Sequence, residues 1–356
     1  MTILLLIIGL VLLVAGAEAL VRGASGIAFA MKVPHLIIGL TVVAYGTSTP
    51  ELAVSVFSGL SGQPDIALGN VVGSNIFNVL LILGLSSMIV PLVVSSQLVR
   101  FDVPVMIAVS ILTFVMGMDG KLGRLDGGIL FTGAVAYTLI LIRMGRKEGN
   151  LDSDDPGDQE KTKADTAAAR WIINILLVLG GLGLLVAGSR LLINSSIVIA
   201  RHLGVSELVI GLTLVAAGTS LPELATSVVA GIRGQRDIAV GNVVGSNIFN
   251  ILAVLGLSSL ISPTGVTIST TAMRFDIPFM IAVAVACLPI FFTGYIIARW
   301  EGLLFVLYYG AYTLYLFLAE ANRSALNTFD QAMIYYIFPL TAVTLTVLAW
   351  RELKRP

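Results

Sequence analysis

Two glutamates, Glu51 and Glu223, stand in nearly the same seven-residue pattern, 172 positions apart. The first pattern reads GTSTPEL from residue 46, and the second reads GTSLPEL from residue 218. Apolar residues surround both patterns, and placing a charged side chain in hydrocarbon costs about 3 kcal/mol on insertion scales. Because such a charge recurs at matching places, we treat both glutamates as candidate functional groups.

The residues around each glutamate would supply further oxygen atoms. In a helix, Thr47 and Glu51 share a face because they are four residues apart, and Ser48 lies one position round. Pro50 lacks an N–H, so it frees backbone carbonyls near Thr47 that can point into a cavity. The second copy repeats this set with Thr219, Ser220, Pro222 and Glu223. Carboxylates, hydroxyls and carbonyls are hard ligands that suit Na⁺ and Ca²⁺, so both motifs predict a cation site beside a helix kink.

A second duplicated motif follows each glutamate. GNVVGSNIFN begins at residue 69 and again at residue 241. Its polar residues recur every four positions and form a stripe on an otherwise apolar helix. The stripe consists of Asn70, Ser74 and Asn78 in the first copy and of Asn242, Ser246 and Asn250 in the second. An isolated stripe is typical of hydrogen bonding between helices, but beside a duplicated glutamate it favours a role in the same site.

The elements that position these motifs are membrane helices. Apolar residues make up 57% of the 356-residue chain and charged residues 12%, with a mean hydropathy of +0.97, whereas soluble domains have about 25% charged residues. The single Cys287 excludes an intramolecular disulfide and a cysteine-rich metal site. Neither HExxH nor GxSxG occurs, which argues against an enzyme.

The apolar segments fall into three groups: five in the first half of the chain, five in the second half and one near the C-terminus. Expected spans are 2–21, 36–59, 66–90, 102–118 and 125–143, then 171–193, 207–231, 238–262, 275–293 and 299–318, and finally 331–350. RFDxP sequences open the fourth and ninth spans, and we expect Asp102 and Asp276 to cap those helices. The predicted units are a first repeat (1–143), a polar cytoplasmic linker (144–170), a second repeat (171–318) and an additional C-terminal helix with a basic tail (319–356).

Five helices per repeat is an odd number, so the second repeat must enter the membrane from the opposite side. The predicted fold is therefore an all-α integral membrane protein of two inverted five-helix repeats plus one extra C-terminal transmembrane helix. With the N-terminus outside, 15 of the 21 Lys and Arg residues fall on the inside and 6 on the outside. This bias predicts a multi-pass protein of the cell (inner or plasma) membrane, with the central loop and the C-terminus cytoplasmic.

Two carboxylates that meet between inverted repeats have a definite charge requirement. Without a metal ion, at least one of them should take a proton, because two close ionised carboxylates repel. One Ca²⁺ neutralises both, and several Na⁺ ions neutralise them or leave a positive excess. A single site that accepts different cations in turn is what an alternating-access exchanger needs.

In two inverted copies, GTSxPEL and GNVVGSNIFN resemble the α-repeats of prokaryotic-type sodium/calcium exchangers in the calcium/cation antiporter superfamily. The resemblance covers both repeats and implies that Glu51 and Glu223 ligate Ca²⁺ and Na⁺. It also implies backbone-carbonyl ligands, at Thr47, Thr219, Ala44 and Ala216. Side-chain oxygens are implied at Ser48, Ser220, Ser74, Ser246, Asn78 and Asn250. The metal ligands proper would be Glu51, Glu223, Thr47 and Thr219.

Two departures narrow the expected ions. Some relatives, notably potassium-dependent exchangers, carry aspartate at the position of Asn250, so asparagine there argues against K⁺ cotransport. Proton-coupled relatives typically carry an acidic residue in the second motif, where this chain has Gly-Ser at both 73–74 and 245–246. We expect an antiporter that exchanges Na⁺ for Ca²⁺. The alternatives are a Ca²⁺/H⁺ antiporter that uses the same two glutamates, and a cation channel.

The expected partners are few. They are the lipid bilayer and the transported ions Ca²⁺ and Na⁺, with H⁺ under the alternative reading. No cofactor and no nucleic acid is expected. Because each chain supplies both halves of the site, we expect it to function as a monomer.

Overall fold

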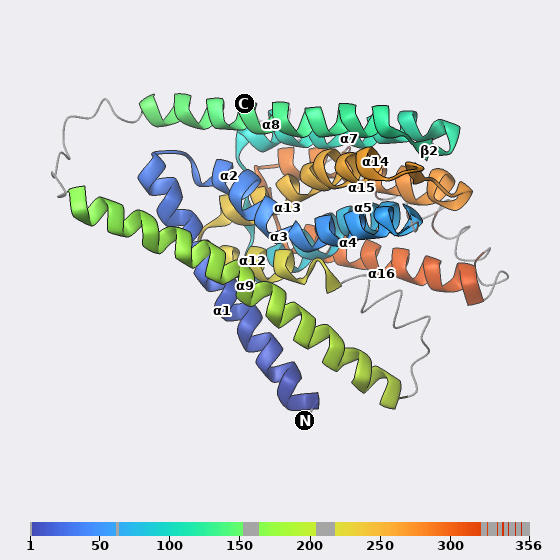
Figure 1. Ribbon diagram of the computed structural model, residues 1–356, viewed down its shortest axis with the longest axis horizontal. Coiled ribbons are helices and arrows are strands. Elements are labelled where there is room, and N and C mark those ends of the chain that lie inside the picture. The colour runs from blue at the N-terminus through green and yellow to red at the C-terminus, as the bar shows by residue number, and fades with distance from the viewer. Residues whose placement is uncertain are drawn as a thin grey trace.

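The computed structural model describes residues 2–61, 64–151, 164–203 and 218–321, together with the isolated residues 326, 333, 337, 341, 346 and 350. Within these residues the fold is a set of long helices around a central group of shorter, broken ones (Figure 1). In the described part of the chain, eight helices are long and apolar enough to cross a membrane, and a ninth crossing arises if His35–Thr47 and Thr49–Leu60 count as one bent span. The predicted all-α integral membrane architecture is confirmed.

The elements of the two repeats follow the same order. The first repeat contains α1 (Thr2–Met31), α2 (His35–Ile38), η1 (Gly39–Val43), α3 (Ala44–Thr47), α4 (Thr49–Leu60), α5 (Pro64–Phe77), η2 (Asn78–Leu83), α6 (Gly84–Ile89), β1 (Leu92–Val93), η3 (Leu98–Asp102), α7 (Val103–Met116), η4 (Gly117–Asp119), β2 (Lys121–Leu122) and α8 (Arg124–Leu151). The second contains α9 (Ala164–His202), α12 (Leu221–Ile232), α13 (Arg236–Phe249), η7 (Asn250–Leu255), α14 (Gly256–Ile261), β3 (Val266–Thr267), η8 (Ala272–Asp276), α15 (Ile277–Phe292), β4 (Ile296–Ile297) and α16 (Arg299–Ala321).

The helix ends differ from the expected spans where polar sequence continues a helix. α8 runs to Leu151 and α9 begins at Ala164, so both ends of the expected flexible linker are helical. Hydropathy marks where a helix leaves the membrane, whereas alanine, lysine, arginine and glutamate allow the helix to continue into water. Three parts of the chain lie outside the described residues: 152–163, the first part of the expected span 207–231 (residues 207–217), and the expected span 331–350 apart from isolated positions.

Equivalent helices of the two repeats run in opposite directions. α1 and α9 cross at glycines, where a Cβ on Gly9 would lie 2.8 Å from the Leu192 nitrogen and one on Gly16 would lie 2.8 Å from the Leu185 nitrogen. A step forward along α1 is therefore a step back along α9, as the two crossing helices show (Figure 1). Since α1 and α9 open the two repeats, this arrangement inverts one repeat relative to the other.

Two short strand pairs also join the repeats. Leu92 in β1 pairs with Ile297 in β4, and Leu122 in β2 pairs with Val266 in β3. Each antiparallel pair links the connection after the third span of one repeat to the connection before the fifth span of the other. The repeats are thus tied together twice, in a pattern that the pseudo-two-fold axis relates.

The helices that carry the GNVVGSNIFN motif form the centre of the molecule. In an apolar 18-residue stretch of each span, 94% of the residues are buried in Arg236–Ile261 and 72% in Ile66–Ile89, whereas 28% are buried in the outer span Thr2–Met31. A helix that is apolar on every side belongs in a protein core or against lipid. The outer helices therefore present their apolar sides to the bilayer, and the central pair holds the polar residues.

Candidate functional site

Both glutamates begin a helix just after a break. The first span bends by 46° between Thr47 and Thr49. Ser48 at the break has φ −83° and ψ 10°, and Pro50 sits in the first turn of α4, where its missing N–H is tolerated. Ser220 and Pro222 occupy the same positions before and in α12, with Ser220 at φ −90° and ψ 7°.

The two carboxylates are fully buried, and each is held by a serine of the other repeat. Ser48 Oγ donates a 2.9 Å hydrogen bond to Glu223 Oε1, and Ser220 Oγ donates a 3.0 Å hydrogen bond to Glu51 Oε1. These two hydrogen bonds therefore join residues about 170 positions apart, one from each repeat.

Among the described residues, four side-chain oxygens of the duplicated motifs are buried without a hydrogen-bond partner. They are Glu51 Oε2, Glu223 Oε2, Asn78 Oδ1 and Asn250 Oδ1, two from each repeat. A buried acceptor without a donor costs about 1–3 kcal/mol, so native proteins rarely keep one without a reason. Four such acceptors, related by the internal symmetry, form a donor set that suits a hard cation.

The amide nitrogens of Asn78 and Asn250 each donate a hydrogen bond, which fixes how the two amide groups are turned. Asn78 Nδ2 donates to Asn247 Oδ1 at 3.0 Å, and Asn250 Nδ2 donates to Asn75 Oδ1 at 3.1 Å. Asn75 and Asn247 in turn donate to each other's backbone carbonyl oxygens, at 3.2 and 3.3 Å. Sequence reasoning missed Asn75 and Asn247 because they lie off the four-residue stripe, although both copies of the motif contain them.

Asn70 and Asn242 support the broken helices. Asn70 Nδ2 donates to the Glu51 carbonyl oxygen at 3.1 Å, and Asn242 Nδ2 donates to the Glu223 carbonyl oxygen at 3.4 Å. Asn242 Oδ1 accepts a hydrogen bond from Thr47 at 3.1 Å, and Asn70 Oδ1 accepts one from Thr219 at 3.4 Å. Because the Thr47 and Thr219 hydroxyls donate these hydrogen bonds, the oxygens that the two threonines can offer to a cation are their backbone carbonyls.

The remaining candidates lie beside these groups. Ser220 Oγ is 3.1 Å from Ser74 Oγ, and Ser246 Oγ donates to the Ala44 carbonyl oxygen at 3.4 Å. Both Ser74 and Ser246 are buried. Ala216, the expected counterpart of Ala44, lies outside the described residues.

The helical irregularities coincide with the polar centre. A π-helical segment begins at Asn78 (η2) and another at Asn250 (η7), so each orphan asparagine stands where an α-helix widens. Such segments occur frequently at functional sites. The described residues hold no cluster of three His, Cys, Asp or Glu side chains, so two carboxylates and neutral oxygens make up this site.

The RFDxP aspartates have a different role from the one expected. Asp102 has helical backbone angles and makes no capping hydrogen bond. Its buried carboxylate instead accepts hydrogen bonds from Tyr137 at 2.8 Å and from Gln97 at 3.0 Å. Asp276 likewise makes no cap and accepts a 3.3 Å bond from Tyr312. The capping prediction was wrong because the preceding π-helical turn already continues the helix, which leaves the carboxylate free to bind the next span.

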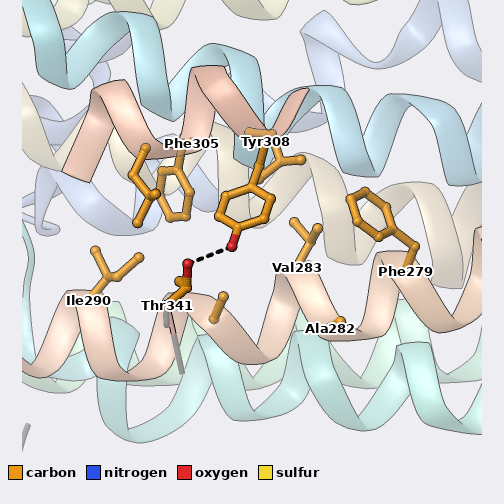
Figure 2. Close-up of a pocket in the computed structure, with 10 residues that line it drawn as sticks. Phe279, Ala282, Val283, Ile290, Phe305, Tyr308 and Thr341 are labelled. Atoms are coloured by element: carbon orange, nitrogen blue, oxygen red, sulfur yellow. Dashed lines mark hydrogen bonds between the residues drawn. The ribbon is translucent and has the colours of Figure 1, made fainter. Parts of the chain in front are cut away.

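A separate apolar cavity of about 240 Å³ lies between α15 and α16 (Figure 2). Phe279, Val283 and Ile290 line one side and Phe305 another, while Tyr308 Oη and Thr341 Oγ1 lie 2.6 Å apart across it. None of the described residues that line this cavity is a carboxylate, so we do not treat it as a candidate cation site.

Comparisons with known proteins agree with the duplicated architecture. The family described as sodium/calcium exchanger protein matches residues 1–143 and 173–318. The chain belongs to the sodium/calcium exchanger family. It is 41% identical to the putative antiporter CaxA of Alkalimonas amylolytica over 79% of this chain and 87% of CaxA. It is 35% identical to the sodium/calcium exchanger MaX1 of Methanosarcina acetivorans over 88% of this chain and 98% of MaX1.

A solved structure of the sodium-calcium exchanger NCX_Mj superposes with a TM-score of 0.73 and 31% sequence identity, over 86% of this chain and 96% of that one. The family is one of transporters, so this protein is a multi-pass membrane cation exchanger and not an enzyme.

Proposed function

We propose that this protein exchanges Na⁺ for Ca²⁺ at a single site between its two inverted repeats. The observation that carries the proposal is the set of four buried oxygens without partners: Glu51 Oε2, Glu223 Oε2, Asn78 Oδ1 and Asn250 Oδ1. Serine hydroxyls and the carbonyls of Thr47, Thr219 and Ala44 would complete the coordination, as Ca²⁺ usually takes six to eight oxygens. The family's Ca²⁺ and Na⁺ are substrates here, and we propose no cofactor.

Charge balance supports exchange between a divalent ion and several monovalent ions. One Ca²⁺ between two carboxylates gives a neutral centre, and two Na⁺ ions give the same net charge. Because the two loads compete for the same oxygens, binding one excludes the other. This competition, together with the inverted repeats, supports alternating access rather than an open channel.

We further propose the orientation that the positive residues favour, with the N-terminus outside and the central segment and C-terminus in the cytoplasm. Na⁺ entering down its gradient would then drive Ca²⁺ out of the cell. Both halves of the site come from one chain, so a monomer is sufficient.

The test is ⁴⁵Ca²⁺ flux into proteoliposomes under a Na⁺, H⁺ or K⁺ gradient, imposed one at a time. We expect flux that depends on the Na⁺ gradient alone and is lost in Glu51→Gln and in Glu223→Gln. Glu301→Gln is a matched control, because Glu301 is also a buried glutamate in a membrane helix but accepts its hydrogen bond from the Ala298 nitrogen, at 2.7 Å. Flux driven by a pH gradient and indifferent to Na⁺ would indicate the Ca²⁺/H⁺ alternative, and flux without any counter-ion would indicate a channel.

A further inference from the structure

An ion pair joins the first helix to the end of a helix that carries a site glutamate. Arg233 Nε, at the C-terminal cap of α12, donates to Glu18 Oε2 at 2.8 Å. Arg22, one turn along α1, bonds the other oxygen of the same carboxylate. The Glu18 side chain is only 21% exposed, so one carboxylate stands between two guanidinium groups. Each guanidinium uses one nitrogen, so the carboxylate bonds Arg22 through one oxygen and Arg233 through the other.

The internal symmetry does not repeat this ion pair. At the offset of 172 residues, Glu18 corresponds to Arg190, Arg22 to Asn194 and Arg233 to Ser61. An arginine, an asparagine and a serine cannot form an ion pair with one another. An ion pair therefore joins α1 to α12, whereas the equivalent residues of α9 and α4 cannot form one.

The two contacts lie on opposite sides of the pseudo-two-fold axis. Gly9 lies against Gly188 and Gly16 against Gly181, so the axis crosses α1 midway, between residues 12 and 13. Glu18 is five to six residues beyond that point, or about 8 Å toward the end of α1 at 1.5 Å per residue. Arg190 lies about as far on the other side. The ion pair thus closes the half of the molecule toward the face where α1 ends.

On the other half, a cavity of about 430 Å³ separates α9 from the start of α4. Its lining includes Thr49, Pro50, Ser189, Arg190, Asn194 and Thr219. Pro50 directly precedes Glu51, and Thr219 directly precedes Ser220, so the cavity borders the two helix breaks that form the site. An ion pair joins α1 to α12 on one half of the molecule, whereas a cavity separates the equivalent helices α9 and α4 on the other.

We propose that the Glu18–Arg233 ion pair is a latch that keeps the cation site closed toward the face at which α1 ends. In the orientation proposed above, that face is the cytoplasmic one. The role of the latch in transport rests on the proposed function, whereas the ion pair itself does not. Opening that face separates α1 from α12 and breaks the pair. Closing the opposite face brings Arg190 toward Ser61, the equivalent of Arg233, which carries no opposite charge. The two access states therefore differ in energy, and the state with the latch closed is favoured when no ion gradient is applied.

The latch can be tested by measuring the distance between α1 and α12 with a pair of spin labels. Phe29 and Ile232 are exposed at 82% and 60% and are suitable labelling positions, in a background with the buried Cys287 replaced by alanine. We expect one dominant distance in the parent. In Glu18→Gln, Arg22 and Arg233 lose the carboxylate between them, so a longer distance should gain at least threefold in population. Arg233→Gln should change the distribution in the same direction.

Two controls separate the latch from general damage. Arg22→Gln removes a bond within α1 only and should leave the distance distribution unchanged. The double variant E18R/R233E restores opposite charges between the two helices and should return the distribution toward the parent. A parental distribution in Glu18→Gln and Arg233→Gln, or an equal change in Arg22→Gln, would overturn the proposal. Because this measurement needs no transported ion, it tests the latch even if the parent shows no Na⁺-dependent Ca²⁺ flux.

Discussion

The Asn75→Ala substitution tests whether the cation site is shaped by residues that do not themselves offer it a free oxygen. The Asn75 side chain makes three cross-repeat hydrogen bonds: its Nδ2 donates to the Asn247 carbonyl oxygen at 3.2 Å and to Met280 Sδ at 3.7 Å, and its Oδ1 accepts from Asn250 Nδ2 at 3.1 Å. Its side chain is 2% exposed, so water cannot readily replace it. The alanine variant leaves the buried Asn250 Nδ2 without its partner and removes one bond from the Asn247 carbonyl oxygen, which still accepts from the Asn250 backbone nitrogen.

The expected magnitude follows from the one donor left without a partner. An unsatisfied buried group costs about 1–3 kcal/mol in the folded protein. Part of this loss appears in ion binding, because the freed Asn250 amide can turn its oxygen away from the carboxylates. We expect the Ca²⁺ dissociation constant to rise at least tenfold, which corresponds to about 1.4 kcal/mol.

The assay is equilibrium ⁴⁵Ca²⁺ binding to purified protein, with thermal unfolding measured in parallel. Asn247→Ala should have a similar effect, because Asn247 Nδ2 donates to the Asn75 carbonyl oxygen at 3.3 Å and its Oδ1 accepts from Asn78 at 3.0 Å. Asn174→Ala is the control, since Asn174 is an asparagine of α9 that packs over Gly26. Parental Ca²⁺ affinity in both Asn75→Ala and Asn247→Ala would refute the positioning role of these amides.

Three further predictions concern packing, the aspartate–tyrosine bonds and ligand linkage. Gly181→Ala should lower the melting temperature clearly, because its Cβ would lie 2.7 Å from the Leu20 nitrogen, whereas Gly180→Ala has no described atom within 4 Å and should be neutral. Tyr137→Phe should destabilise the protein by about 1–3 kcal/mol in chemical unfolding, and Tyr312→Phe by less, since the bonds they lose measure 2.8 and 3.3 Å; equal effects would contradict this reading. Ca²⁺ at 100 times its dissociation constant should stabilise the parent by about 2.7 kcal/mol but should leave Glu51→Gln and Glu223→Gln unchanged in thermal scans.

Much of the architecture could be predicted because it depends on composition and periodicity. Hydropathy located the spans, and their odd number in each repeat predicted the inversion that the antiparallel α1 and α9 confirm. Errors arose where a residue's role depends on a neighbour from another span. Asp102 was expected at a helix cap, but Tyr137 and Gln97 bind its carboxylate. The helices α8 and α9 extend past the membrane because hydropathy does not detect helical sequence in water.

The sequence by itself determined the chemistry available at the centre: two carboxylates, hydroxyls and amides in duplicate, all of them hard oxygen donors. Only the tertiary structure decided which oxygens are free. Ser48 and Ser220 each donate a hydrogen bond to the carboxylate of the other repeat. Asn247 and Asn75 accept hydrogen bonds from the amide nitrogens of Asn78 and Asn250. Among the described residues, one oxygen on each glutamate and on Asn78 and Asn250 remains without a partner. Likewise, the pairing of Glu18 with Arg233 depends on how α1 packs against α12. Contacts between residues so distant in sequence are set by helix packing, and no local pattern encodes them.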